Sequence, residues 1–316
     1  MNKMLIILFL LSINFYCHAQ QEQQYTQFMY NKLSINPGYA GSKGVPCLTA
    51  VFRKQWIGLD GAPETQVLSF QGLSKNKKIG LGINFNRNLI GISERWTAEG
   101  NYAYRIKTGD VTLAIGIQAS LRYYGANFSD RRLVSITPLQ ADGAIELGSQ
   151  TKYLPNFGMG FYLDNKNFYL GFSVPRLLKN DLDFNELGAI PSSEIRHINA
   201  MAGFTINLSN EAILYPQLLI KYASNVPLSA DINLNILLGN IITVGATYRT
   251  GRSSASSGES LDFILGGQIS DRIFLGFSYD MTLSELKAYN QGGVEALVQY
   301  CFTKRSPVEF INPRYF

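Results

Sequence analysis

Residues 111–124 read VTLAIGIQASLRYY and alternate in character along their length. The odd-numbered side chains, from Val111 to Tyr123, are apolar, whereas the even-numbered ones, from Thr112 to Arg122, are small or polar. A period of two with one apolar face predicts a β-strand. The stretch is long for a strand of a soluble protein, but about ten tilted residues are what a membrane-crossing strand needs.

Strand-like stretches of this kind recur through the chain. They are Cys47–Gln55, Thr65–Gly72, Lys78–Asn86, Trp96–Ile106, Val111–Tyr124, Tyr153–Leu163, Phe168–Val174, Arg196–Leu208, Ala212–Tyr222, Leu228–Leu238, Ile241–Arg249, Leu261–Ile269, Ile273–Met281 and Val294–Phe302. An even count of about fourteen falls within the range of bacterial outer-membrane barrels. We therefore predict an all-β fold, a transmembrane antiparallel β-barrel.

Composition supports a membrane protein. Of the 316 residues, 46% are hydrophobic and 16% are charged, whereas soluble proteins carry roughly a quarter charged residues. The formal net charge of +5 comes without a basic block, so nucleic acid is not an expected partner. After the first residues no apolar run is long enough for a membrane helix, so a mature chain that crosses a membrane must do so as a barrel.

The first residues resemble a secretory signal. Lys3 gives the positive region, Met4–Leu11 the apolar one, and Cys17-His18-Ala19 the cleavage site before Gln20. We expect a signal peptide over 1–19, an N-terminal periplasmic or plug segment over 20–44, the barrel over 45–303 and a periplasmic tail over 304–316.

The connections between the predicted strands alternate between long and short. Residues 87–95 are expected to form one of the long connections. At the end of the barrel where the long connections lie, 223–227 is the single short one. Long loops outside and tight turns in the periplasm are typical of outer-membrane barrels. With an even number of strands, both termini are expected to be periplasmic.

Several blocks resemble the PorP/SprF family of outer-membrane proteins of the type IX secretion and gliding machinery. They are Gln27–Asn31, Ile35–Ser42, Arg53–Pro63, Lys78–Gly82, Tyr102–Arg105, Ser278–Asp280 and Leu286–Tyr289. The resemblance implies a non-enzymatic role in gliding motility or protein secretion, with no cofactor. It implies binding, delivery or cell-surface anchoring of secreted, adhesin-like proteins that carry a C-terminal sorting domain. Periplasmic and outer-membrane secretion components are the other implied partners. The alternative is a channel or transporter for a small or hydrophobic solute.

The candidate residues for a functional site come from two blocks of the sequence. They are Gln27, Phe28, Asn31, Asn36, Pro37 and Tyr39 in the opening segment, and Gln55, Trp56, Asp60 and Pro63 after the first strand. One interpretation is that Pro and Gly in these blocks only shape turns. The other is that the opening segment enters the lumen from the periplasmic side and fills it, since a barrel of this size has room for an occupant or a channel.

Catalysis and metal binding have little support. His197 is the only histidine after the signal peptide, and a hydrolase would need a nucleophile beside it. One histidine and scattered cysteines make no zinc site. The run Asp181–Glu186 resembles the start of a calcium loop, but Glu186 and Ser192 stand where glycine and an acidic ligand are expected.

Cys47 and Cys301 fall on the first and last predicted strands. These strands are neighbours if the barrel closes, and an oxidising compartment would allow a disulfide between them. Bonding depends on the register of the two strands, which the sequence does not give. Unpaired cysteines are the preferred interpretation, and a disulfide is the alternative.

Overall fold

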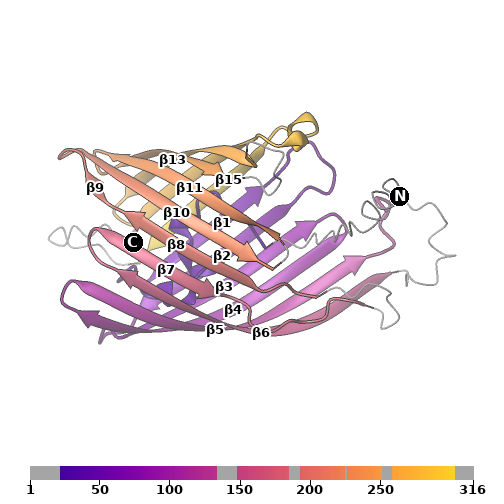
Figure 1. Cartoon of the computed structure of the whole chain (residues 1–316), viewed down its shortest axis with the longest axis horizontal. Helices are drawn as coiled ribbons and strands as arrows, with labels where there is room; N and C mark the ends of the chain where they lie inside the picture. The colour runs from indigo at the N-terminus through magenta and orange to yellow at the C-terminus, as the bar shows by residue number, and fades with distance from the viewer. Residues whose placement is uncertain (1–21, 134–147, 185–192, 225, 251–257, 303–316) are drawn as a thin grey trace, which may run out of the picture.

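The computed structural model describes residues 22–133, 148–184, 193–224, 226–250 and 258–302. The predicted signal peptide (1–19) and tail (304–316) lie outside this range. Within it, one antiparallel sheet closes on itself through the pairing of β15 with β1 (Figure 1). The strands are β1 (Cys47–Lys54), β2 (Glu64–Leu73), β3 (Ile79–Ile90), β4 (Ser93–Thr108), β5 (Val111–Asn127), β6 (Ser149–Asp164), β7 (Phe168–Val174), β8 (His197–Phe204), β9 (Ile206–Asn207), β10 (Ala212–Ala223), β11 (Val226–Leu238), β12 (Ile242–Arg249), β13 (Ser260–Ser270), β14 (Ile273–Thr282) and β15 (Gly293–Cys301).

The predicted barrel is confirmed. The strands pair in sequence order, except that β8 and β9 do not pair with each other. Both pair with β10, so they share one position in the wall. The barrel therefore has fourteen strand positions in the described part of the chain. No helix among the described residues is long and apolar enough to span a membrane.

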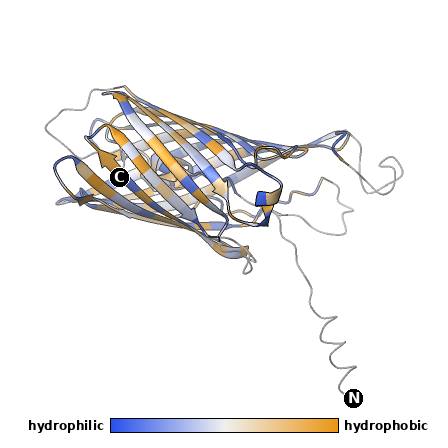
Figure 2. Ribbon diagram, turned by 90° about the horizontal axis from the view of Figure 1, so that it is seen from above, coloured by the Kyte–Doolittle hydropathy of each residue, from blue (hydrophilic) through white to orange (hydrophobic). Residues whose placement is uncertain are grey.

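The parity of the sequence sets which side chains face the lipid. On β5, Ile115, Ile117 and Leu121 are 41%, 60% and 50% exposed, whereas Gln118 and Arg122 on the opposite parity are buried. Hydrophobic and hydrophilic residues alternate along the strands in the same way (Figure 2). An apolar outer face and a polar inner face are what a lipid-embedded barrel requires.

The two rims of the barrel differ in their connections. Residues 74–78, 109–110, 165–167, 208–211, 239–241 and 271–272 make short turns at one rim, here called the short-turn rim. At the opposite rim, the long-loop rim, the strands end and begin again around the connections 55–63, 91–92, 128–148, 175–196, 224–225, 250–259 and 283–292. Within these connections, residues 134–147, 185–192, 225 and 251–257 lie outside the described part of the chain. The predicted long connection over 87–95 is wrong. β3 and β4 stay paired up to Ile90 and Ser93, because Gly91 takes a positive φ of 57° that lets the chain reverse tightly.

The chain before β1 packs against the inner face of the barrel wall. This N-terminal segment, residues 22–44, contains three single turns of 3₁₀-helix. The turns are η1 (Phe28–Tyr30), η2 (Lys32–Ser34) and η3 (Pro37–Tyr39). Phe28, Met29 and Tyr39 are fully buried and share one hydrophobic cluster with Val51 and Leu297 of the wall. A transmembrane barrel thus contains an apolar core that its own N-terminal segment supplies.

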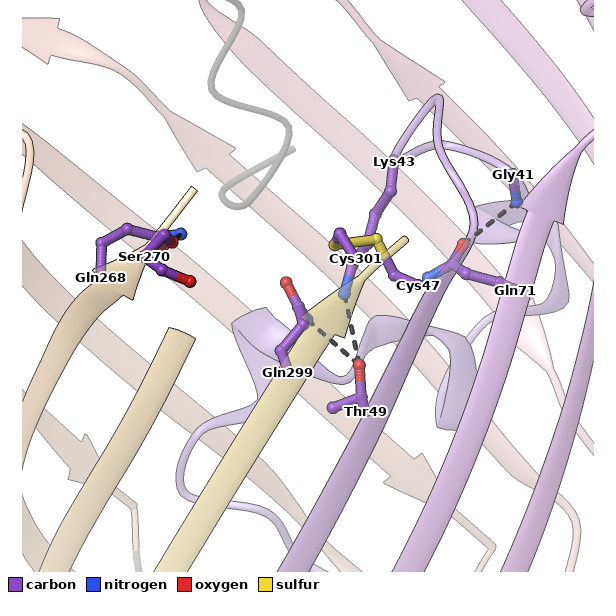
Figure 3. Close-up of a disulfide and its surroundings, with 9 residues drawn as sticks. All are labelled: Gly41, Lys43, Cys47, Thr49, Gln71, Gln268, Ser270, Gln299 and Cys301. Carbon is purple, nitrogen blue, oxygen red and sulfur yellow. Dashed lines mark hydrogen bonds between the residues drawn. A yellow bond between two sulfur atoms is a disulfide. The ribbon is translucent and has the colours of Figure 1, made fainter. Parts of the chain in front are cut away.

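The seam between β1 and β15 is crosslinked. Cys47 and Cys301 stand directly opposite each other in the ladder and form a disulfide (Figure 3). Beside it, Gln299 donates a hydrogen bond of 3.1 Å to the Thr49 hydroxyl. The preferred interpretation of unpaired cysteines is therefore wrong, because the register of the two strands brings both side chains together.

We expect the double variant Cys47→Ser/Cys301→Ser to unfold more easily. The bond links residues 254 positions apart, and a crosslink over so long a loop restricts the unfolded chain by roughly 2–5 kcal/mol. The midpoint of urea unfolding in detergent measures the effect. A reductant should lower the wild-type midpoint equally and leave the double variant unchanged; equal midpoints for wild type and variant would contradict the prediction.

Candidate functional site

One buried carboxylate anchors the start of the N-terminal segment. Both side-chain oxygens of Glu295 accept 2.9 Å hydrogen bonds from backbone N–H groups, one from Thr26 and one from Gln27. Arg53 lies 3.2 Å from Glu295 and 2.5 Å from Asp280, and the Thr26 hydroxyl donates to Asp280. All five residues are buried. The predicted site residue Gln27 is therefore tied to three strands through one ion-pair network.

Asn36 and Pro37 fix the far half of the segment against β5, β6 and β7. The Asn36 side chain accepts a bond from its own turn, at the Gly38 N–H, and donates a 2.9 Å bond to the Phe161 carbonyl. The backbone comes so close to β5 that a Cβ added at Gly116 would lie 2.3 Å from the Gly38 nitrogen. Only glycine at position 116 allows this approach.

Two further candidates, Asn31 and Tyr39, contact polar and aromatic side chains, as does Lys32, which was not among the predicted site residues. The Lys32 ammonium lies 3.5 Å from the centre of the Tyr169 ring, a cation–π contact. Tyr39 packs edge-on against Tyr162 at 5.1 Å. The Asn31 side-chain oxygen accepts bonds from Ser34 and Ser69.

The segment runs the length of the barrel. Glu22 and Gln24 line a cavity at the long-loop rim with Trp56, whereas the Gly41 N–H bonds to Gln71 near the short-turn rim. The expectation that the segment enters from the short-turn rim is therefore wrong for the described residues. The described chain begins at one rim and ends, at residue 302, at the other.

The second block of candidates builds part of the long-loop rim. Gln55 donates a hydrogen bond to the Pro63 carbonyl, and Ile57 exchanges backbone bonds with residues 291 and 292 of the last long connection. Gln55, Trp56 and Pro63 line the rim cavity, whereas Asp60 is exposed and does not. The structure thus brings three of these four residues beside the start of the N-terminal segment.

The charged residues of the lumen were missed as site residues. They include Glu22, Arg53, Glu99, Arg122, Arg176, Glu194, Lys221, Asp231, Arg249, Asp262, Asp280 and Glu295. A signal was available, because a charge on a membrane-crossing strand must face the interior and find a partner. Arg53, Arg122 and Glu295 all stand on the inward parity of apolar strands. Sequence cannot say which charges pair, since their partners come from distant strands.

His197 and the calcium-like run are the residues that the sequence analysis weighed for catalysis and metal binding. The His197 ring lies 2.9 Å from the Ile195 carbonyl. Among the residues that the structure describes, no three histidine, cysteine or acidic side chains cluster as metal ligands. In the calcium-like run, Glu186 and Ser192 lie outside the described residues.

These observations define a class: a lipid-embedded, outer-membrane β-barrel whose interior is packed by its own N-terminal segment. The chain matches the family described as "Type IX secretion system membrane protein PorP/SprF" over residues 17–300. It belongs to that family, and it is a type IX secretion barrel of the outer membrane.

Similar solved structures are outer-membrane proteins of low identity. Omp33 of Acinetobacter baumannii is 8% identical with a TM-score of 0.49, covering 82% of this chain and 98% of that one. A Pseudomonas aeruginosa FadL homologue is 10% identical with a TM-score of 0.46, covering 90% and 96%. The CymD monoaromatic hydrocarbon channel is 11% identical with a TM-score of 0.46, covering 88% and 93%. A comparison with curated proteins finds no match.

We expect Glu295→Gln to loosen the N-terminal segment. It leaves Arg53 short of one buried partner, and breaking a buried pair typically costs about 3–5 kcal/mol. Hydrogen exchange at the Thr26 and Gln27 amides should accelerate, and the unfolding midpoint should fall. Glu94→Gln is the control, because Glu94 pairs with Arg87 near the surface, where a pair contributes about 1 kcal/mol or less. Equal effects of the two substitutions would refute the anchoring role.

Proposed function

We propose that this barrel is a non-enzymatic component that binds or anchors a secreted protein carrying a C-terminal sorting domain at the cell surface. The observation that carries this proposal is the lumen packed by the N-terminal segment, which leaves the long-loop rim as the surface for recognition. Exposed loops on a rigid scaffold are where proteins build binding sites. The short-turn rim then faces the periplasm and the secretion machinery.

Family membership supports the role in secretion, and the geometry of the loops supports the long-loop rim as the binding surface. The connection 55–63 is bonded to 283–292 and, through Gly61 and Gly91, to 91–92. Three loops around the first and last strands thereby form one connected surface. Leu286 and Tyr289 are exposed on it, at 39% and 71%. Exposed apolar side chains on ordered loops suit a protein partner.

Affinity purification of the mature protein from native membranes in mild detergent tests the proposal. We expect a secreted protein at near-equal amount. Trp56→Ala at the long-loop rim should lower the captured amount several-fold, since truncating a central aromatic commonly costs about 2 kcal/mol or more. Asn76→Ala, in a turn of the opposite rim, is the matched control. Recovery of the barrel without any secreted protein would count against the proposal.

The N-terminal segment is, in this proposal, a plug. Its packing against the wall supports this, because a Cβ added at Gly80 of β3 would lie 1.9 Å from the Ala40 carbonyl oxygen. The wild-type barrel should therefore conduct poorly in planar bilayers, and Gly80→Val should dislodge the segment and raise conductance.

Gly100→Val provides the control for conductance, because a Cβ there meets nothing within 4 Å. It should leave the wild-type value unchanged. A wild-type barrel that conducts as well as Gly80→Val would reject the plug and favour the alternative, a channel for small or hydrophobic solutes.

A further inference from the structure

The cavity at the long-loop rim has a volume of about 310 Å³. It lies between the first residues of the N-terminal segment and the ends of β3, β4 and β5. One side is apolar, with Ile90 and Leu182, and another is basic, with Arg95 and Arg122. A concave site that pairs an apolar wall with a few placed charges is the usual form of a ligand site.

Two buried guanidinium groups converge on one carboxylate at this cavity. The Glu22 carboxylate is paired with Arg176 and lies 3.5 Å from Arg122. Arg122 also pairs with Glu194 at 2.6 Å, and Arg176 lies 3.7 Å from Glu99. Burial alone would raise the pKa of Glu22, but Arg176 and Arg122 lower it overall. The site therefore holds an ionised carboxylate.

Arg95 is the second arginine in the lining of the cavity, beside Arg122, whereas Arg176 lies behind Glu22 and lines a smaller neighbouring cavity. Within the described ranges Arg95 has no ion-pair partner. While Glu22 is in place, the three carboxylates of Glu22, Glu99 and Glu194 balance the charge of the three arginines. When Glu22 leaves, one unit of positive charge is left over, which a carboxylate from outside the chain would neutralise.

Glu22 can leave without dislodging the rest of the segment. The backbone anchors on Glu295 begin four residues later, at Thr26 and Gln27. Before them, Tyr25 is buried in the hydrophobic cluster, and Gln24 donates a 3.4 Å side-chain bond to Glu259. Displacement of Glu22 therefore needs movement of residues 22–24 alone. Because Glu22 is tethered beside the two arginines, a competing carboxylate needs a further contact to displace it. The apolar wall of the cavity provides that contact.

We propose that the rim cavity is a binding site for a carboxylate of the partner polypeptide, and that Glu22 occupies this site while no partner is bound. The partner carboxylate takes the place of Glu22 on Arg122 and Arg176 and is drawn in by Arg95. An adjacent apolar side chain of the partner packs on Ile90 and Leu182. The carboxylate belongs to a chain end or to an acidic side chain; both have the same chemistry. The inference rests on the proposed function in taking the partner to be a polypeptide.

Tryptophan fluorescence provides the test. The chain has two tryptophans, and only Trp56 lines the cavity, so full-length mature protein carrying Trp96→Phe reports on this site. Three peptides are titrated: acetyl-Gly-Gly-Leu with a free carboxylate, its amide, and the amide of acetyl-Glu-Gly-Leu. The proposal expects at least one carboxylate peptide to bind about tenfold tighter than the plain amide. Which one binds identifies the source of the carboxylate.

Variants give effects of opposite sign. Glu22→Gln should tighten binding of the carboxylate peptide about tenfold, because the internal competitor no longer carries a charge, whereas Arg95→Gln should weaken it by a similar factor. Arg95→Gln breaks no ion pair within the described ranges, so we expect the variant to fold. Asp110→Asn, exposed at the short-turn rim, should change nothing. The proposal is overturned if the plain amide binds equally well, if no peptide binds, or if Glu22→Gln fails to tighten binding.

The two proposals fail separately. Capture of a secreted protein from native membranes, together with equal binding of acid and amide peptides, would reject the carboxylate site and leave the proposed function standing. Carboxylate-selective binding without any captured partner would reject the proposed function and leave the carboxylate site standing.

Discussion

Closure of the sheet is the constraint on which the rest of this structure depends. A bilayer offers no hydrogen bonds to backbone groups, so an open sheet edge cannot stay in it. β15 meets this requirement by pairing with β1 over eight residue pairs, from Cys47 with Cys301 to Lys54 with Val294. Closing the sheet then creates an interior, and the side chains that face this interior have requirements of their own.

Those requirements are electrostatic. Side chains that face inward on a lipid-embedded wall are polar, and once water is excluded each buried charge needs a partner. Asp231 meets Arg249 at 2.8 Å and Lys221 at 2.7 Å, while Arg53 meets Asp280 and Glu295. Glu295 also accepts bonds from the N-terminal segment. The segment is thus part of how the lumen satisfies its polar groups, which is why its packing and the wall's charges belong to one network.

The strands of the wall could be predicted from local periodicity. Features that depend on pairing between distant residues could not. The period of two in residues 111–124 identifies β5 and its outward face because it depends only on neighbouring residues. The connection over 87–95 misled because polar residues continue the ladder to a turn at Gly91. Contacts between residues far apart in sequence determine three features that the sequence did not predict. They are the bond between Cys47 and Cys301, the direction of the N-terminal segment, and the partners of Arg122. Parity still showed which charges must be inside.

The packing of the N-terminal segment against the inner wall bears on where we propose that this barrel acts. An open barrel offers its whole inner surface to a solute, whereas here fully buried side chains such as Phe28 and Tyr39 occupy that surface. Within the described residues, the long-loop rim offers the cavity beside Glu22 and the loops bonded around the seam. The described part of this segment begins at the cavity, where the Glu22 carboxylate lies beside two arginines. If the rim binds a partner as proposed, packing inside the barrel and recognition at its rim are linked through one short stretch of chain. A partner that displaces Glu22 would then reach only the part of the segment that precedes its buried anchors.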